Sequence, residues 1–152
     1  AALAVSDNGE CYYSTDGFNW NRVGILNDKV VNKIKKHRSQ ILFATTTGLY
    51  QDGGSFYTGS VSLQLLDILN DVQKSFQASV NDIDSNFEKA VITLSDGRYL
   101  VYTDSFTVYT DSKLSALHKV LIINDDIWLF GYNYFRIVSE DFIRKLATGS
   151  RL

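Results

Sequence analysis

The sequence contains neither proline nor methionine in 152 residues, and it has a single cysteine, Cys11. One cysteine excludes an internal disulfide framework. Cys11 stands in an alternating apolar run, which favours a buried, unreactive thiol over a nucleophile. The chain starts with "AALAV", a pattern typical of the middle of a strand. Without a methionine, such a chain is expected to be a processed product or a fragment of a longer protein.

Long hydrophobic runs and an excess of one charge are also lacking. No stretch approaches the roughly 18 continuous apolar residues of a membrane-spanning helix, so we expect no membrane span. The formal net charge is -2, and acidic and basic residues are interspersed, so no nucleic-acid partner is expected. The one basic cluster, "KIKKHR" at residues 33–38, is interpreted as a solvated strand edge or turn rather than an anion-binding patch.

An internal repeat is the clearest feature that the chain does contain. The sequence "VNKI" at residues 31–34 recurs as "VNDI" at residues 80–83, 49 residues later. Four copies of one pattern begin near residues 2, 41, 90 and 120, each with short apolar or alternating runs separated by polar turns. This pattern is typical of β-hairpins. Residues that tolerate a positive φ angle are expected at the first turn of each copy. They are Gly9, Gly48, Gly97 and, in the fourth copy, Asp126.

The repeat predicts an all-β fold: a β-propeller, or a propeller fragment, of about four small antiparallel blades. The blades of this single domain, residues 1–152, are expected roughly at residues 1–24, 25–60, 61–112 and 113–140. The first copy lacks an innermost strand. Closure would therefore need a missing upstream segment, the C-terminal segment or a larger ring of blades. An unfinished propeller also has open edges that invite pairing with another chain.

Two segments depart from the strand pattern. Residues 61–76 carry Leu65, Leu69, Val72 and Phe76 at helical spacing, which is compatible with an inserted helix. The repeated sequence "ILND" argues instead that part of this segment is an outer strand and turn. Residues 139–149 predict a short C-terminal helix, with Ser139 as its N-cap.

The stretch "YYSTDGFNW" at residues 12–20 contains the most specific motif. Ser14, Asp16, Gly17 and Trp20 resemble the Asp-box of sialidase and BNR-repeat propellers, and the related repeats of sortilin-like and photosystem-assembly-factor propellers. An Asp at a hairpin tip accepts hydrogen bonds from nearby backbone N–H groups. The aromatic residue four positions later is expected to fold under the turn and bury its ring. The resemblance implies a structural turn at the blade periphery.

Two later turns are degenerate versions of this motif. Asp52, Gly53 and Phe56 keep the acid, the glycine and the aromatic, whereas Asp104 keeps only the acid and an apolar partner, Val108. All of these residues are interpreted as structural devices rather than ligands.

Catalytic residues are not expected. The sequence "FRIV" at residues 135–138 only superficially resembles the arginine motif of sialidases, since it lacks the proline and follows the Asp-boxes. Asp125–Asp126 and Glu140–Asp141 are adjacent pairs, which on a strand would point to opposite faces rather than converge as glycosidase acids must. His37 and His118 stand alone, so no metal site is predicted, and no cofactor is expected.

Tyrosine-rich clusters are the candidates for ligand binding, because Tyr offers adaptable contacts and stacking faces for sugars. The candidate residues are Tyr102, Tyr109, Tyr132, Tyr134 and Arg136. The alternative interpretation is that these rings pack between blades.

The expected function is a non-catalytic binding or assembly module within a larger assembly such as a virion, with an extracellular or virion location. Its partner would be a protein or the rest of the propeller. One alternative is a glycan-binding or glycan-hydrolysing propeller with its catalytic residues outside this chain. Another is an assembly-factor-like chaperone.

Overall fold

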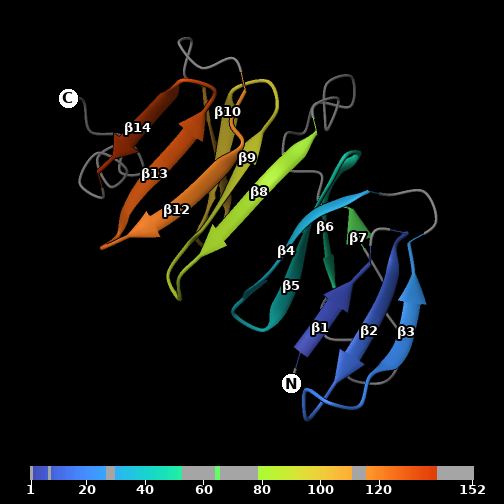
Figure 1. Ribbon diagram of the computed structural model, residues 1–152. Coiled ribbons are helices and arrows are strands. Elements are labelled where there is room, and N and C mark those ends of the chain that lie inside the picture. The colour runs from blue at the N-terminus through green and yellow to red at the C-terminus, as the bar shows by residue number, and fades with distance from the viewer. Residues whose placement is uncertain are drawn as a thin grey trace. The chain divides into compact units, whose positions relative to one another are not determined.

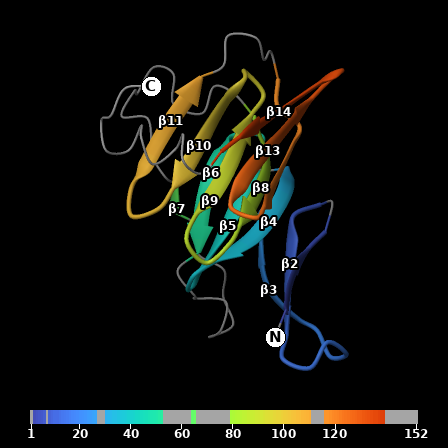
Figure 2. The ribbon, with the colours of Figure 1, turned by 90° about the vertical axis from the view of Figure 1, so that its left-hand side faces the viewer.

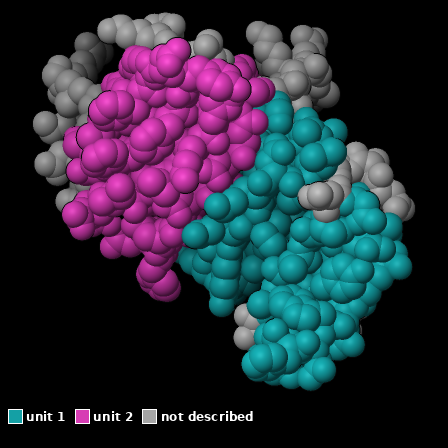
Figure 3. All heavy atoms as spheres, in the orientation of Figure 1, with its two compact units in different colours: residues 1–80 teal, residues 81–152 magenta. Residues whose placement is uncertain are grey.

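The computed structural model describes residues 2–6, 8–26, 30–52, 64–65, 79–110 and 116–139, and among them all regular structure is β-strand. The strands form four small antiparallel sheets (Figure 1). The prediction of an all-β fold with small antiparallel sheets is therefore confirmed. Residues 1–80 and 81–152 form two compact units, coloured separately in Figure 3.

Unit 1 contains two sheets in which strands follow one another in chain order. The first sheet consists of β1 (Ala2–Val5), β2 (Glu10–Ser14) and β3 (Asn21–Ile25). The second consists of β4 (Val31–His37), β5 (Gln40–Thr45), β6 (Gly48–Asp52) and the short β7 (Gln64–Leu65). The two sheets thus have three and four described strands.

The core of unit 1 lies between these sheets. Ile41 and Phe43 of β5 are buried, and partly buried apolar side chains from both sheets pack against them. These side chains include alternate residues of β1, because successive residues of a strand point to opposite faces. They are Leu3, Val5, Tyr13, Leu26, Val31, Ile34 and Tyr50.

Unit 2 repeats the same architecture. One sheet consists of β8 (Val80–Ser85, with Val80 the last residue of unit 1), β9 (Ala90–Leu94), β10 (Arg98–Tyr102) and β11 (Phe106–Thr110). The other consists of β12 (Lys119–Ile123), β13 (Asp126–Gly131) and β14 (Tyr134–Val138). Figure 2 shows β10 and β11 lying next to each other as an antiparallel pair. The core joins Val91, Tyr99 and Val101 of one sheet to an apolar face of the other. That face carries Val120, Ile127, Leu129 and Val138.

The first turn of three copies is closed as the sequence predicts. Gly9, Gly48 and Gly97 have φ angles of +84°, +148° and +89°. At Gly9 a side chain would also meet the backbone, because an added Cβ would overlap the carbonyl oxygen of Leu26.

The expectation for Asp126 is wrong. Asp126 begins β13 and pairs with Ile123, while Asn124 and Asp125 take positive φ angles of 51° and 68°. A two-residue hairpin turn of this kind needs positive φ at both central residues, and Asn and Asp tolerate it best after Gly.

The two predicted helices fall mostly outside the described residues. Of residues 61–76, only Gln64 and Leu65 are described, and they form β7, paired with β6. Part of this segment is therefore strand, as the repeated "ILND" argued. The predicted C-terminal helix at residues 139–149 lies outside the described residues apart from Ser139.

Candidate functional site

The turn after β2 is built by Ser14 and Asp16. The Ser14 hydroxyl is buried, donates to Asp16 Oδ1 (3.1 Å) and accepts from the backbone N–H of Gly17 (2.8 Å). Asp16 Oδ1 accepts from the backbone N–H groups of Phe18 and Asn19, both at 2.8 Å. Gly17 has a φ angle of +83°. The expected Asp-centred turn is thus present, with its hydrogen bonds closed within six residues.

The hydrogen bonds of this turn hold the pKa of the Asp16 carboxyl well below its usual range. The backbone N–H of Asn19 has the largest effect, followed by that of Phe18 and by the Asn19 side-chain amide. The carboxylate is therefore the form that the turn stabilises.

The pKa of Asp16 leads to a prediction about acid stability. A folded-state pKa below the unfolded value contributes stability above the unfolded pKa, about 3.9, and this stability is lost as pH falls through the folded pKa. Asp16→Asn should therefore unfold at lower urea concentration than wild type at pH 7, and the gap should narrow steadily below about pH 4. Glu88→Gln, at an exposed acid outside the motif turns, controls for the change in net charge. A gap that stays constant down to pH 2 would contradict the assignment.

Trp20 departs from the expectation. Its side chain is 42% exposed, and so the ring is not buried beneath the turn. Trp20 directly precedes β3 at the end of the turn, and its ring is only partly covered there.

The two degenerate motifs are described only in part. Asp52 is buried at the end of β6, while Gly53 and Phe56 lie outside the described residues. Asp104 lies exposed in the turn between β10 and β11, and Val108 on β11 is only partly covered.

The tyrosine candidates are spread over two sheets of unit 2. Tyr102 stacks on Phe106 with ring centroids 4.2 Å apart, and Tyr109 stacks on Tyr99 at 5.2 Å. Both pairs stack between the neighbouring strands β10 and β11 of one sheet.

The remaining candidates lie on the β13–β14 hairpin. Tyr134 packs against the core of unit 2, and Arg136 lies on β14 opposite Leu129. Tyr132 is 80% exposed at the hairpin turn, tilted against His118 with ring centroids 4.0 Å apart. The five candidate residues do not converge on one site.

A partly exposed apolar surface on β12–β14 was not predicted; Ile123, Phe135 and Ile137 are its exposed members, and the others are half-buried. It consists of the residues that point away from the unit 2 core, and we name it the aromatic face. Its members are Leu121, Ile123, Trp128, Phe130, Phe135 and Ile137. Phe135 is 60% exposed and lies near both Trp128 and Phe130, with ring centroids 6.4 and 6.3 Å apart. The sequence indicated this face through the run "IWLF". Every residue of the run is apolar, so the strand has apolar side chains on both faces.

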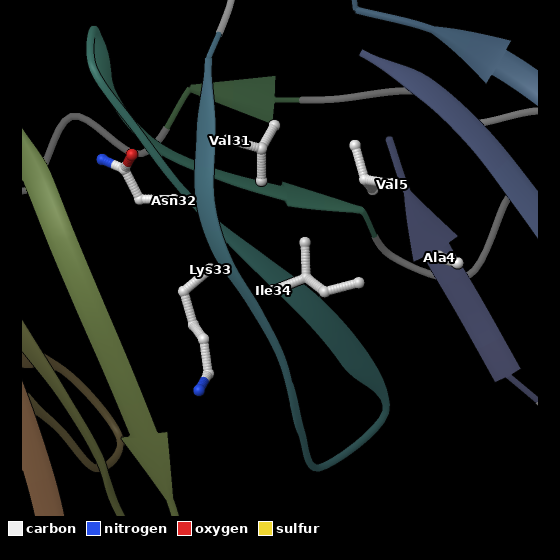
Figure 4. Close-up of a pocket in the computed structure, with 6 residues that line it drawn as sticks. All are labelled: Ala4, Val5, Val31, Asn32, Lys33 and Ile34. Carbon is white, nitrogen blue, oxygen red and sulfur yellow. The ribbon is translucent and has the colours of Figure 1, made fainter. Parts of the chain in front are cut away.

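A groove in unit 1 lies between β1 and β4. It has a volume of about 380 Å³ and is lined by Ala4 and Val5 from β1 and by Val31, Asn32, Lys33 and Ile34 from β4. Val31 and Ile34 point toward β1, whereas Asn32 and Lys33 point the other way (Figure 4).

The repeated asparagines make equivalent long-range hydrogen bonds. Asn32 Nδ2 donates to the carbonyl oxygen of Val80 at 2.8 Å within unit 1. Asn81, the matching residue of the second "VN" sequence, donates to the carbonyl oxygen of Leu117 at 2.7 Å within unit 2. In both cases the amide of one copy bonds to the backbone at the start of the next strand pattern.

The described residues hold no group of three or more His, Cys, Asp or Glu side chains suited to a metal ion. Cys11 is buried as predicted; burial raises the pKa of its thiol, and the negative charge of Asp52 raises it further. Within the described ranges, no helix is long and apolar enough to cross a membrane.

Comparison with known proteins leaves the Asp-box resemblance as a prediction. No protein-family model matches the chain, and no curated protein matches it either.

Proposed function

We propose that this chain is a non-catalytic, propeller-type binding or assembly module that works within a larger protein assembly. The observation that carries the proposal is the aromatic face of β12–β14. Contiguous exposed apolar surface of this kind usually marks a protein interaction site, because water solvates it poorly.

The register of the sheet makes this face continuous. Leu121 lies opposite Trp128, and Trp128 lies opposite Ile137, so that one apolar row crosses all three strands. Phe130 lies opposite Phe135 in the next row. Aromatic pairs of this kind concentrate binding energy when a partner covers them.

The occupant that we propose for this face is the equivalent β-sheet of a second copy of this chain. The opposite face of the same sheet already packs on β9 and β10 through Val120, Ile127 and Leu129. Stacked sheets bury alternating side chains in this way on both inner faces. The aromatic face alternates with the core-facing side chains along the same strands and has the same length, so it suits packing against a second sheet.

The self-association of the chain tests this proposal, because a second copy is the partner always present. We expect a concentration-dependent dimer in analytical ultracentrifugation, and Phe135→Ser should weaken it at least tenfold. Phe87→Ser is the matched control, since Phe87 is 83% exposed in the turn between β8 and β9 and lies outside the aromatic face. A wild-type chain that stays monomeric at every concentration would overturn the proposal. Glycan binding lost in Phe135→Ser would favour the carbohydrate alternative instead.

A further inference from the structure

The first sheet of unit 1 is one strand shorter than its neighbour in the described part of the chain. β1 and β5 occupy the same place in their copies, because each is followed by a turn that Gly9 or Gly48 closes at positive φ. β5 is flanked by β4 and β6, whereas β1 pairs only with β2 among the described residues. In the first sheet, a strand corresponding to β4 would therefore lie along the outer edge of β1.

The groove lies at this edge. Ala4 and Val5 of β1 form one wall, and four residues of β4 form the other. Val5, Val31 and Ile34 also pack against the buried Ile41 and Phe43, so the groove has an apolar base (Figure 4). A main-chain edge beside an apolar groove is the arrangement that recruits an added strand: backbone groups give affinity and the groove accepts alternate side chains.

The two four-stranded sheets show which sequence fits such a position. Their first strands, β4 and β8, both begin with Val-Asn followed by any residue and Ile. The asparagine of each donates to a backbone carbonyl, Asn32 to Val80 and Asn81 to Leu117. Val31 stands 49 residues before Val80 in the repeat and lines the groove. By analogy with the Val80 carbonyl, which accepts from Asn32, the Val31 carbonyl would accept a hydrogen bond from an asparagine in an added strand.

We propose that the outer edge of β1 binds an extended segment of a partner polypeptide with the sequence pattern Val-Asn-x-Ile, which completes the first sheet as its fourth strand. The inference rests on the proposed function as a binding or assembly module, and it names a second surface and the chemistry of its partner. The main chain of the segment pairs with β1, its asparagine amide donates to the Val31 carbonyl, and its apolar side chains cover Val5 and Ile34.

The probe is the capped peptide SVNDIDS, the chain's own sequence at residues 79–85, labelled with fluorescein and titrated with the full chain by fluorescence anisotropy. We expect saturable binding. Replacing the peptide asparagine with alanine should weaken binding roughly fivefold, the effect of one neutral hydrogen bond. A peptide N-methylated at alternate amides keeps every side chain but loses its backbone donors, and should not bind.

Two protein variants locate the site. Ala4→Trp should abolish peptide binding, because Ala4 is exposed and lines the groove. Ala2→Trp is the matched control on the same face of β1 outside the groove, and it should bind as wild type does. Urea midpoints of both variants confirm that they fold.

Phe135→Ser separates this inference from the proposed function, because it removes the aromatic face and leaves the groove intact. It should bind the peptide with unchanged affinity. No binding of SVNDIDS, equal binding of the N-methylated peptide, or full binding by Ala4→Trp would each overturn the strand-addition site, whatever the dimerisation experiment shows.

Discussion

Replacing Phe43 with alanine is expected to lower the free energy of unfolding by about 3–5 kcal/mol. Phe43 is fully buried in the middle of β5, where it forms the core of unit 1 with Ile41. Removing its ring forfeits the transfer free energy of the buried carbons and leaves a cavity that strands fixed by backbone hydrogen bonds close only in part. Domains of this size are stable by about 5–15 kcal/mol, so the loss is a large fraction of the total.

Urea unfolding followed by tryptophan fluorescence measures this loss, and Trp20 reports on unit 1. Phe87→Ala is the control, because the same ring is removed from a site that is 83% exposed. The control should change stability by no more than about 0.5 kcal/mol. A loss below about 1 kcal/mol for Phe43→Ala would mean that β5 does not lie at the centre of a packed core.

Features set by neighbouring residues could be predicted from the sequence. Alternating apolar runs and glycine turns gave the all-β class, because strand periodicity and positive φ are properties of a few consecutive residues. The Asp16 turn belongs to the same category. Its acceptors and donors lie within three residues of one another.

Features that depend on what covers a face could not be predicted. The motif indicated that Trp20 would be buried, but the structure leaves its ring 42% exposed. The apolar run containing Trp128 is typical of a strand covered on both sides. Whether a second sheet lies over it depends on tertiary packing, which strand periodicity does not specify.

The repeat is a mixed case. The match between "VNKI" and "VNDI" was visible in the sequence, but the role of its asparagine was not. The carbonyls that Asn32 and Asn81 bond lie 48 and 36 residues further along the chain. Such distant partners emerge only when the strands are placed in space.

Asp82→Ala should destabilise unit 2 by about 1–3 kcal/mol, the cost of leaving a buried donor without its acceptor. Asp82 lies on β8, and its Oδ2 accepts from the backbone N–H of Val120 on β12 at 3.0 Å. Asp84, two residues on, accepts in the same way from the N–H of Ile122 at 2.6 Å. The two carboxylates thereby join the sheet that contains β8 to the edge of β12, and Val120 is buried.

The size of the loss alone would not separate a lost hydrogen bond from a disturbed strand, so amide hydrogen exchange supplies the second readout. In Asp82→Ala the amide of Val120 should exchange faster than that of Ile122, because Asp84 still accepts from Ile122. Asp82→Asn retains an acceptor oxygen and should recover most of the stability. Asp96→Ala, which removes an exposed acid paired with Arg98, should cost no more than about 1 kcal/mol. Equal protection of Val120 in wild type and Asp82→Ala would show that the carboxylate does not hold the edge of β12, because protection would then come from elsewhere.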